Sequence, residues 1–103
     1  MRSLIALAVV LAASPAWALG EWYDHYLKAR DRLIPAGNCP EALKELAEAV
    51  RLKPASGLNQ VTYGLQFEDY LPYYWMGVCH QKAGNNPAAI RMFNQEEDRR
   101  AIQ

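Results

Sequence analysis

The sequence predicts an all-α protein made of two helix-turn-helix repeats that stack on each other. The first observation is internal repetition, because the stretch AGNCPEAL at 36–43 returns 47 residues later as AGNNPAAI at 83–90. The second is that Gly-Asn in each copy suits the end of a helix, and the proline two residues later suits the first turn of the next helix. Units of this size are too small to bury their own apolar faces and therefore stack.

The N-terminal residues 1–18 have the pattern of a signal peptide. Arg2 precedes an apolar run at 4–13, and Ala16-Trp17-Ala18 supplies the small residues of a cleavage site. Because the apolar run is too short to span a bilayer, we expect cleavage after Ala18 and a periplasmic or secreted domain at 19–103 with no membrane span. Removal of Arg2 would leave ten basic against eleven acidic side chains. This balance provides no bulk positive charge for a nucleic-acid partner.

The first repeat is expected at about 22–54. Its first helix covers about 21–34, where aromatic and aliphatic side chains fall at helical spacing. Its second helix covers about 40–53, where apolar residues alternate with acidic and basic ones at the same spacing. Asn38 or Cys39 is expected to cap this second helix.

The second repeat is expected at about 70–101. Its first helix should run from about Tyr70 or Pro72 to Ala83, and its second from Pro87 to about Ala101. Between the repeats, the helical pattern fails over 55–69, and serine, glycine and asparagine are frequent there. We therefore expect an irregular connector with one helical turn near Phe67.

The repeated pattern resembles a known family. From Tyr73 to Phe93 the chain reads Tyr-x2-Met-Gly-x2-His-x3-Gly-x4-Ala-x3-Phe, which is similar to the tetratricopeptide repeat. The matching positions of the first copy are Tyr26, Ala29, Leu33, Gly37, Ala42, Leu46, Ala49 and Pro54. The resemblance covers about 22–54 and 70–101 and implies a short right-handed solenoid of the kind found in small exported bacterial proteins. The chain departs from the family pattern at Arg30 and at Glu96, where small residues are usual.

The resemblance also implies a function. Tetratricopeptide domains are noncatalytic scaffolds that bind a protein or peptide segment in a groove lined by the first helix of each repeat. Carried onto this sequence, the groove residues are Leu27, Asp31, Ile34, Tyr74, Val78 and Gln81. Two alternatives stay open: a structural module that forms a homodimer, in which another copy covers the surface of a missing third repeat, and a fragment of a longer repeat protein.

The two cysteines, Cys39 and Cys79, favour a disulfide. An even number of cysteines in an exported chain usually forms bridges, and stacked repeats would bring these two residues to the same side of the stack. The alternative is two separate buried thiols, since an unpaired cysteine packs as a small apolar residue.

Other chemistry is poorly supported, and we expect no enzymatic activity, no cofactor and no metal. Cys79-His80 lacks the earlier cysteine of a haem-attachment motif, and the cysteines and histidines do not have the paired spacing of a zinc site. The hydroxyl nucleophiles after residue 18 are Ser56 and Thr62, both in the connector. The acidic run at 96–98 is expected on a solvated face.

Overall fold

The computed structural model of this protein describes residues 21–100, without the side chain of Arg100. The predicted signal peptide at 1–18 and its cleavage after Ala18 lie outside the described residues. The elements, in chain order, are α2 (Trp22–Lys28), the π-helical segment η2 (Ala29–Leu33), α3 (Cys39–Leu52), β1 (Gly57–Val61), β2 (Phe67–Tyr70), α4 (Pro72–Lys82) and α5 (Asn86–Arg100).

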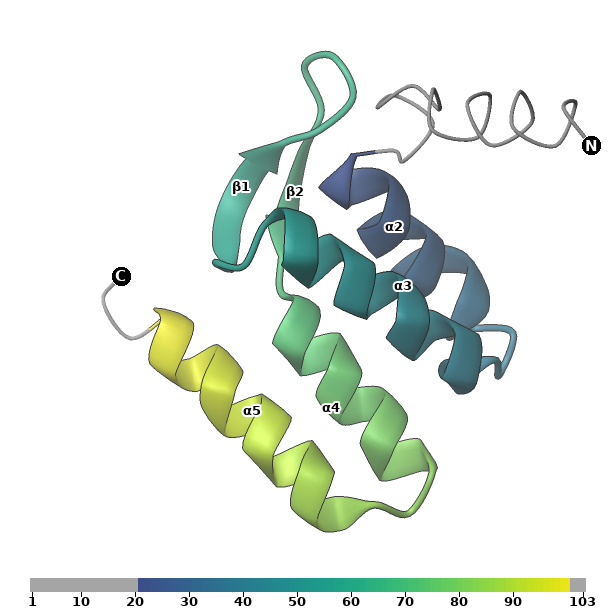
Figure 1. The fold of residues 1–103 in the computed structure, drawn as a ribbon. Coiled ribbons are helices and arrows are strands. Elements are labelled where there is room, and N and C mark those ends of the chain that lie inside the picture. The colour runs from purple at the N-terminus through teal and green to yellow at the C-terminus, as the bar shows by residue number, and fades with distance from the viewer. Residues whose placement is uncertain (1–20, 101–103) are drawn as a thin grey trace, which may run out of the picture.

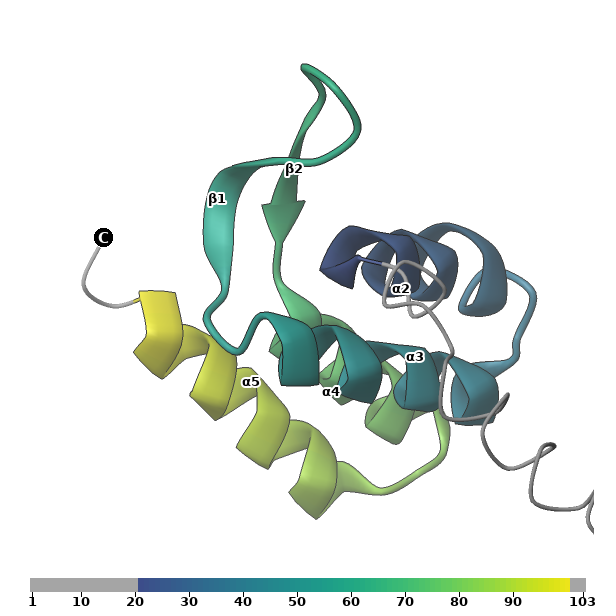
Figure 2. The ribbon, with the colours of Figure 1, turned by 45° about the horizontal axis from the view of Figure 1, so that its top comes forward.

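The helices form two antiparallel pairs. Helix α2 with η2 packs on α3, and α4 packs on α5, while α3 also contacts α4 and so joins the two pairs (Figure 1). Strands β1 and β2 connect α3 to α4 and rise beside the start of α2. Their turn extends beyond the helices, as a second view of the same ribbon shows (Figure 2).

The strands contradict the all-α prediction, because the chain is mixed α/β. Strands β1 and β2 form an antiparallel hairpin within the connector expected to be irregular. The predicted helical turn near Phe67 is likewise wrong, since Phe67 begins β2. A short turn closes the hairpin: Gly64 has a positive φ of 57°, and the N–H of Thr62 donates to the carbonyl of Gln66 at 2.8 Å. Valine, threonine and aromatic residues on both sides of that glycine favour extended backbone over helix.

The turns inside the two helix pairs have nearly the same geometry. Gly37 and Gly84 have φ values of 79° and 80°, a left-handed conformation that glycine adopts without steric cost. The N–H groups of Asn38 and Asn85 donate to carbonyls five residues earlier at 2.8 and 2.9 Å. Each of these asparagines also caps the next helix, because its side-chain oxygen accepts from the backbone N–H three residues later at 3.3 Å. The 47-residue sequence repeat is therefore also a repeat of hydrogen bonds.

The main core lies where α2, η2, α3 and α4 meet beneath the hairpin. Its buried residues are Tyr26, Ala29, Ile34, Cys39, Ala42, Leu46, Ala49, Tyr70 and Cys79. The rings of Tyr26 and Tyr70 meet edge to face, 5.0 Å apart, which joins α2 to β2. Helices α4 and α5 pack closely at Gly77, because the ring of Phe93 occupies the space that a side chain at position 77 would need.

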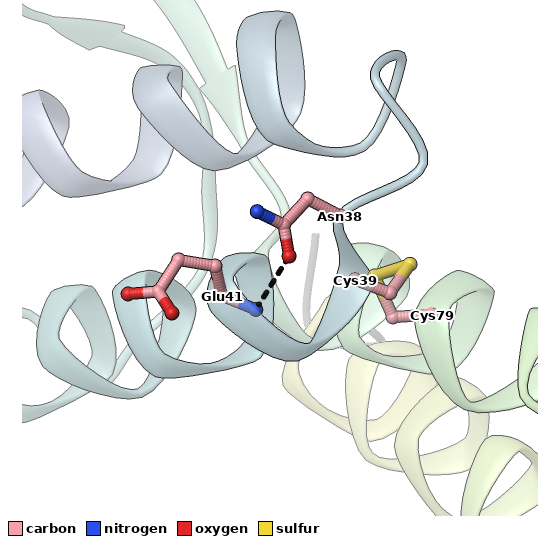
Figure 3. Close-up of a disulfide and its surroundings, with 4 residues drawn as sticks. All are labelled: Asn38, Cys39, Glu41 and Cys79. Atoms are coloured by element: carbon pink, nitrogen blue, oxygen red, sulfur yellow. Dashed lines mark hydrogen bonds between the residues drawn. A yellow bond between two sulfur atoms is a disulfide. The ribbon is translucent and has the colours of Figure 1, made fainter.

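A disulfide between Cys39 and Cys79 links the two helix pairs, as predicted. Cys39 is the first residue of α3 and Cys79 lies in the last part of α4, and their Cα atoms are 5.3 Å apart (Figure 3). The Asn38 cap is the residue directly before the bridge, so the same end of α3 is held by a hydrogen bond and by a covalent bond.

Candidate interaction surface

The six residues of the predicted groove occupy different environments. Leu27 and Asp31 line a hollow of about 330 Å³ between α2 and the hairpin. Ile34 is buried in the core. On α4, the ring of the exposed Tyr74 lies 5.8 Å from that of Phe93 on α5, while Val78 is half-buried and Gln81 is exposed. The structure thus brings Leu27 and Asp31 together beside the hairpin and places Ile34 in the interior.

The hollow beside α2 has a mixed polar rim. It is lined by Asp24, Leu27, Lys28, Asp31, Arg32 and Tyr63. Two of its charges already have partners, since Lys28 pairs with Glu45 at 3.2 Å and Asp31 pairs with Arg30 at 2.7 Å. The hollow therefore combines Leu27 and Tyr63 with two acidic and two basic side chains, so it has no large charge of one sign that would attract a highly charged ligand.

Tyr63 fastens the hairpin turn to α2 across this hollow. Its hydroxyl donates a hydrogen bond to the carboxylate of Asp24, and its ring meets the ring of Tyr23 edge to face at 4.7 Å. The hydrogen bond to Asp24 raises the pKa of Tyr63 to about 12. The pKa of Asp24 is lowered, mainly by the hydrogen bond from the backbone N–H of Glu21 and then by that from Tyr63. Tyr63 is therefore protonated and Asp24 ionised at neutral pH, as this hydrogen bond requires.

Large apolar side chains are exposed along the hairpin. Leu58, Val61, Leu65 and Phe67 are 43%, 55%, 89% and 58% exposed, and we refer to these four residues as the hairpin strip. The chain from 54 to 67 carries no charged residue, although charged residues make up 21% of the sequence. Large apolar side chains that are exposed together on one element, rather than scattered singly over the surface, often mark a binding site.

The register of the hairpin shows which way the strip faces. Val61 and Phe67 lie opposite each other across the two strands, so their side chains share a face. Gln60 and Glu68, one position along, are on the other face. Glu68 accepts a hydrogen bond from Arg30 at 2.9 Å, so that face is directed toward the helices. Val61 and Phe67 therefore point away from the helical body.

Buried tyrosines hold the base of the hairpin. The hydroxyl of Tyr70 donates to the carbonyl of Lys53 at 2.8 Å, and that of Tyr26 donates to the carbonyl of Asp69 at 2.7 Å. Burial raises the pKa of both tyrosines, which keeps them protonated as donors at neutral pH. The side chain of Asp69 in turn accepts from the N–H of Asn59 at 3.0 Å and so connects β2 to β1. The hairpin is thus fastened at its base and at its turn, with the strip left uncovered.

Glu96 is a buried residue that the sequence analysis placed in solvent. Its side chain is 3% exposed, and its Oε1 accepts from the N–H groups of Tyr73 and Tyr74 at 3.1 and 3.2 Å. It therefore caps the start of α4 from the neighbouring helix α5, satisfying two of the N–H groups that have no partner within α4. The sequence contained a signal for this burial. When the two copies are aligned without gaps, Glu96 occupies the position of Ala49, a small core residue of the first copy. A carboxylate at an expected core position requires a hydrogen-bond partner.

A second hollow of about 500 Å³ lies beside this cap. It is lined by Ala55, Gln95, Asp98 and Arg99, and the guanidinium of Arg99 sits 5.4 Å from the centre of the Tyr73 ring. The Tyr73 hydroxyl donates to the carbonyl of Pro54 at 2.6 Å. These contacts join α5 and α4 to the chain that enters the hairpin, so we interpret this region as structural.

The described residues, 21–100, contain no group of three or more histidine, cysteine, aspartate or glutamate side chains arranged to hold a metal ion. Among the helices in the same part of the chain, none combines the length and the apolar character needed to cross a bilayer. Comparison of the chain with protein-family models, with curated proteins and with solved structures found no match.

Proposed function

We propose that this chain is a noncatalytic protein-interaction module whose contact surface is the hairpin strip together with the hollow beside Tyr63. The observation that carries the proposal is the exposure of four large apolar side chains on the hairpin, in a stretch, 54–67, that has no charged residue. Removing such side chains from water is the main favourable term in most protein association. Leu27 and Asp31, two residues of the predicted groove, line the hollow between α2 and the hairpin turn, which none of the four strip side chains lines.

The anchoring of the hairpin supports a binding role. A two-stranded hairpin is marginally stable alone, but here Tyr70, Tyr26 and Arg30 hold its base and Tyr63 holds its turn. A surface that is ordered before it meets its partner loses less conformational entropy on binding. The strip is thus presented in a form suited to recognition.

Three side chains of types that often act in catalysis already have structural roles, which supports a binding role rather than catalysis. Cys39 and Cys79 form the disulfide, so neither offers a thiolate. The buried carboxylate Glu96 is used as a helix cap. The resemblance to tetratricopeptide repeats and the signal-peptide pattern further support a scaffold that acts in the bacterial cell envelope.

Photocrosslinking in the native host tests this proposal. A photoreactive phenylalanine analogue placed at position 65 is compared with one at position 90, because Leu65 and Ile90 are both exposed but Ile90 lies on α5, which contributes no residue to the proposed surface. We expect protein adducts from position 65 and few from position 90. Equal, low yields at both positions would contradict a protein-binding role for the hairpin.

A further inference from the structure

We infer that the hairpin strip is a self-association surface, which joins two copies of this chain face to face through their hairpins. The inference rests on the proposed function, because it names the partner for the same surface. It differs from a homodimer built on the repeat faces of α2 or α5, because the contacts come from the connector between the repeats.

The charge pattern favours a second copy as the partner. In a two-fold symmetric contact each surface meets itself, so a charge near the symmetry axis would face the same charge on the partner. Around Val61, Leu65 and Phe67 this repulsion is avoided, because no charged residue occurs from 54 to 67. Asp69 is exposed on the same face as Phe67, but it lies toward the base of the hairpin, where its carboxylate accepts the N–H of Asn59 at 3.0 Å. The neighbouring hollow has no large charge of one sign either, since it contains two acidic and two basic side chains. The strip thus contains nothing that would attract a strongly charged partner.

The area of the strip is compatible with a weak dimer. From the exposed fractions of its four side chains, each copy would contribute roughly 500 Å², so a pair would bury on the order of 1,000 Å². Stable specific interfaces begin near 1,200 Å² in total, and about 1,000 Å² is the lower limit for a biological contact. We therefore expect association that depends on concentration rather than an obligate dimer.

The exposed edges of β1 and β2 disfavour a dimer in which the two hairpins pair edge to edge into a larger sheet. They favour contact between the outer faces of the hairpins instead. The edge of β1 is interrupted by a bulge at Leu58 and Asn59, where Asn59 has a φ of 53°. The side-chain amide of Gln60 donates to the carbonyl of Leu58 at 2.9 Å. On β2, the backbone carbonyl of Asp69 already accepts a hydrogen bond from the Tyr26 hydroxyl. Bulges and covered backbone groups are devices that prevent edge-to-edge pairing, whereas the outer faces carrying Val61 and Phe67 can pack as two layers.

Sedimentation velocity of the chain expected after signal-peptide cleavage, residues 19–103, tests the inference over about 5–500 µM, because the apolar run at 4–13 could itself cause association. We expect the mean mass to rise from that of one chain toward twice that value. The variants Val61→Lys and Val61→Glu should each weaken dimerisation at least tenfold, because each places like charges in the contact, and mixing them should restore association. Ile90→Gln is the matched control, since it removes an equally exposed apolar side chain from α5 and should leave the dimer intact. Circular dichroism checks that each variant is folded.

The outcomes separate this inference from the proposed function. A wild-type chain that stays monomeric to 500 µM, or Val61 variants that dimerise as well as wild type, would overturn self-association. If position 65 still crosslinks to a different protein, the binding role survives and the partner is that protein. Binding of the monomer to neutral phosphatidylcholine vesicles, abolished by the Val61 variants, would instead make the strip a membrane-contacting surface and would also overturn the inference.

Discussion

Reduction of the Cys39–Cys79 disulfide should strongly destabilise the fold. The bridge closes a loop of 40 residues that contains most of α3, the hairpin and most of α4. On the chain-entropy model, a loop of this length stabilises the native state by roughly 4 kcal/mol, because it restricts the unfolded chain. Domains of this size have total stabilities of only about 5–10 kcal/mol, so the bridge would supply a large share.

Urea unfolding, followed by helical circular dichroism with and without dithiothreitol, measures this effect. For a urea m-value of about 1 kcal/mol per molar, the midpoint should fall by roughly 3–4 M on reduction. The double variant Cys39→Ser/Cys79→Ser is the control, and its midpoint should not respond to dithiothreitol. A fall of less than about 1 M in the wild type would refute the reasoning. It would mean that the reduced, unfolded chain is as restricted as the bridged one.

Three further predictions concern single side chains. Gly77→Ala should destabilise the chain by about 1–2 kcal/mol in urea unfolding, because the new Cβ would lie 2.5 Å from the Phe93 ring, and this overpacking exceeds the helix-propensity gain of alanine. Glu96→Ala should lower the free energy of unfolding by about 2–3 kcal/mol, because a buried and a partly buried N–H group of α4 lose their acceptor. The stabilising hydrogen bond of Tyr63 should be complete below pH 10 and lost as the pH rises toward 12, because the folded-state pKa is raised. Tyrosinate absorbance at 295 nm should therefore show a phase near pH 12 that Tyr63→Phe removes.

Matched variants test each explanation. Gly77→Ala should do little harm in a Phe93→Leu background, where the ring is gone, and a stabilising effect beside the intact ring would contradict the packing argument. Glu97→Ala, an exposed neighbour on α5, should change stability by less than about 0.5 kcal/mol. If Glu96→Ala is equally harmless, Glu96 is not an effective cap. A Tyr63→Phe chain that keeps the phase near pH 12 would assign it to another tyrosine.

The hairpin was the part of the fold that sequence reasoning missed. Gly57, Asn59 and Gly64 were interpreted as loop residues, yet Asn59 and Gly64 have positive φ values within the bulge and the turn of the hairpin. The run VTY before Gly64 and the phenylalanine after it were a weak hairpin signal that the strong helical repeat overshadowed. Two short strands gain stability only from what they pack on, here Tyr26 and Arg30 of the first helix pair.

The candidate surface was predictable only in part. Leu27 and Asp31 reach the hollow because helical periodicity places them on one side of the first helix. Ile34 has a similar spacing but lies in the core, since periodicity defines a face and does not say what covers it. Leu58, Val61, Leu65 and Phe67 were not among the predicted site residues, because their exposure depends on where the hairpin projects.

The sequence by itself determined the local structure of this protein: the four helical stretches, the two Gly-Asn turns and the pair of cysteines. These features depend on backbone preferences and spacing along the chain, which act over a few residues. Only the tertiary structure decided that the connector forms a hairpin, that Glu96 caps a neighbouring helix, and which apolar side chains remain exposed. Each of these depends on contacts between residues more than twenty positions apart, and such contacts leave little trace in local sequence pattern.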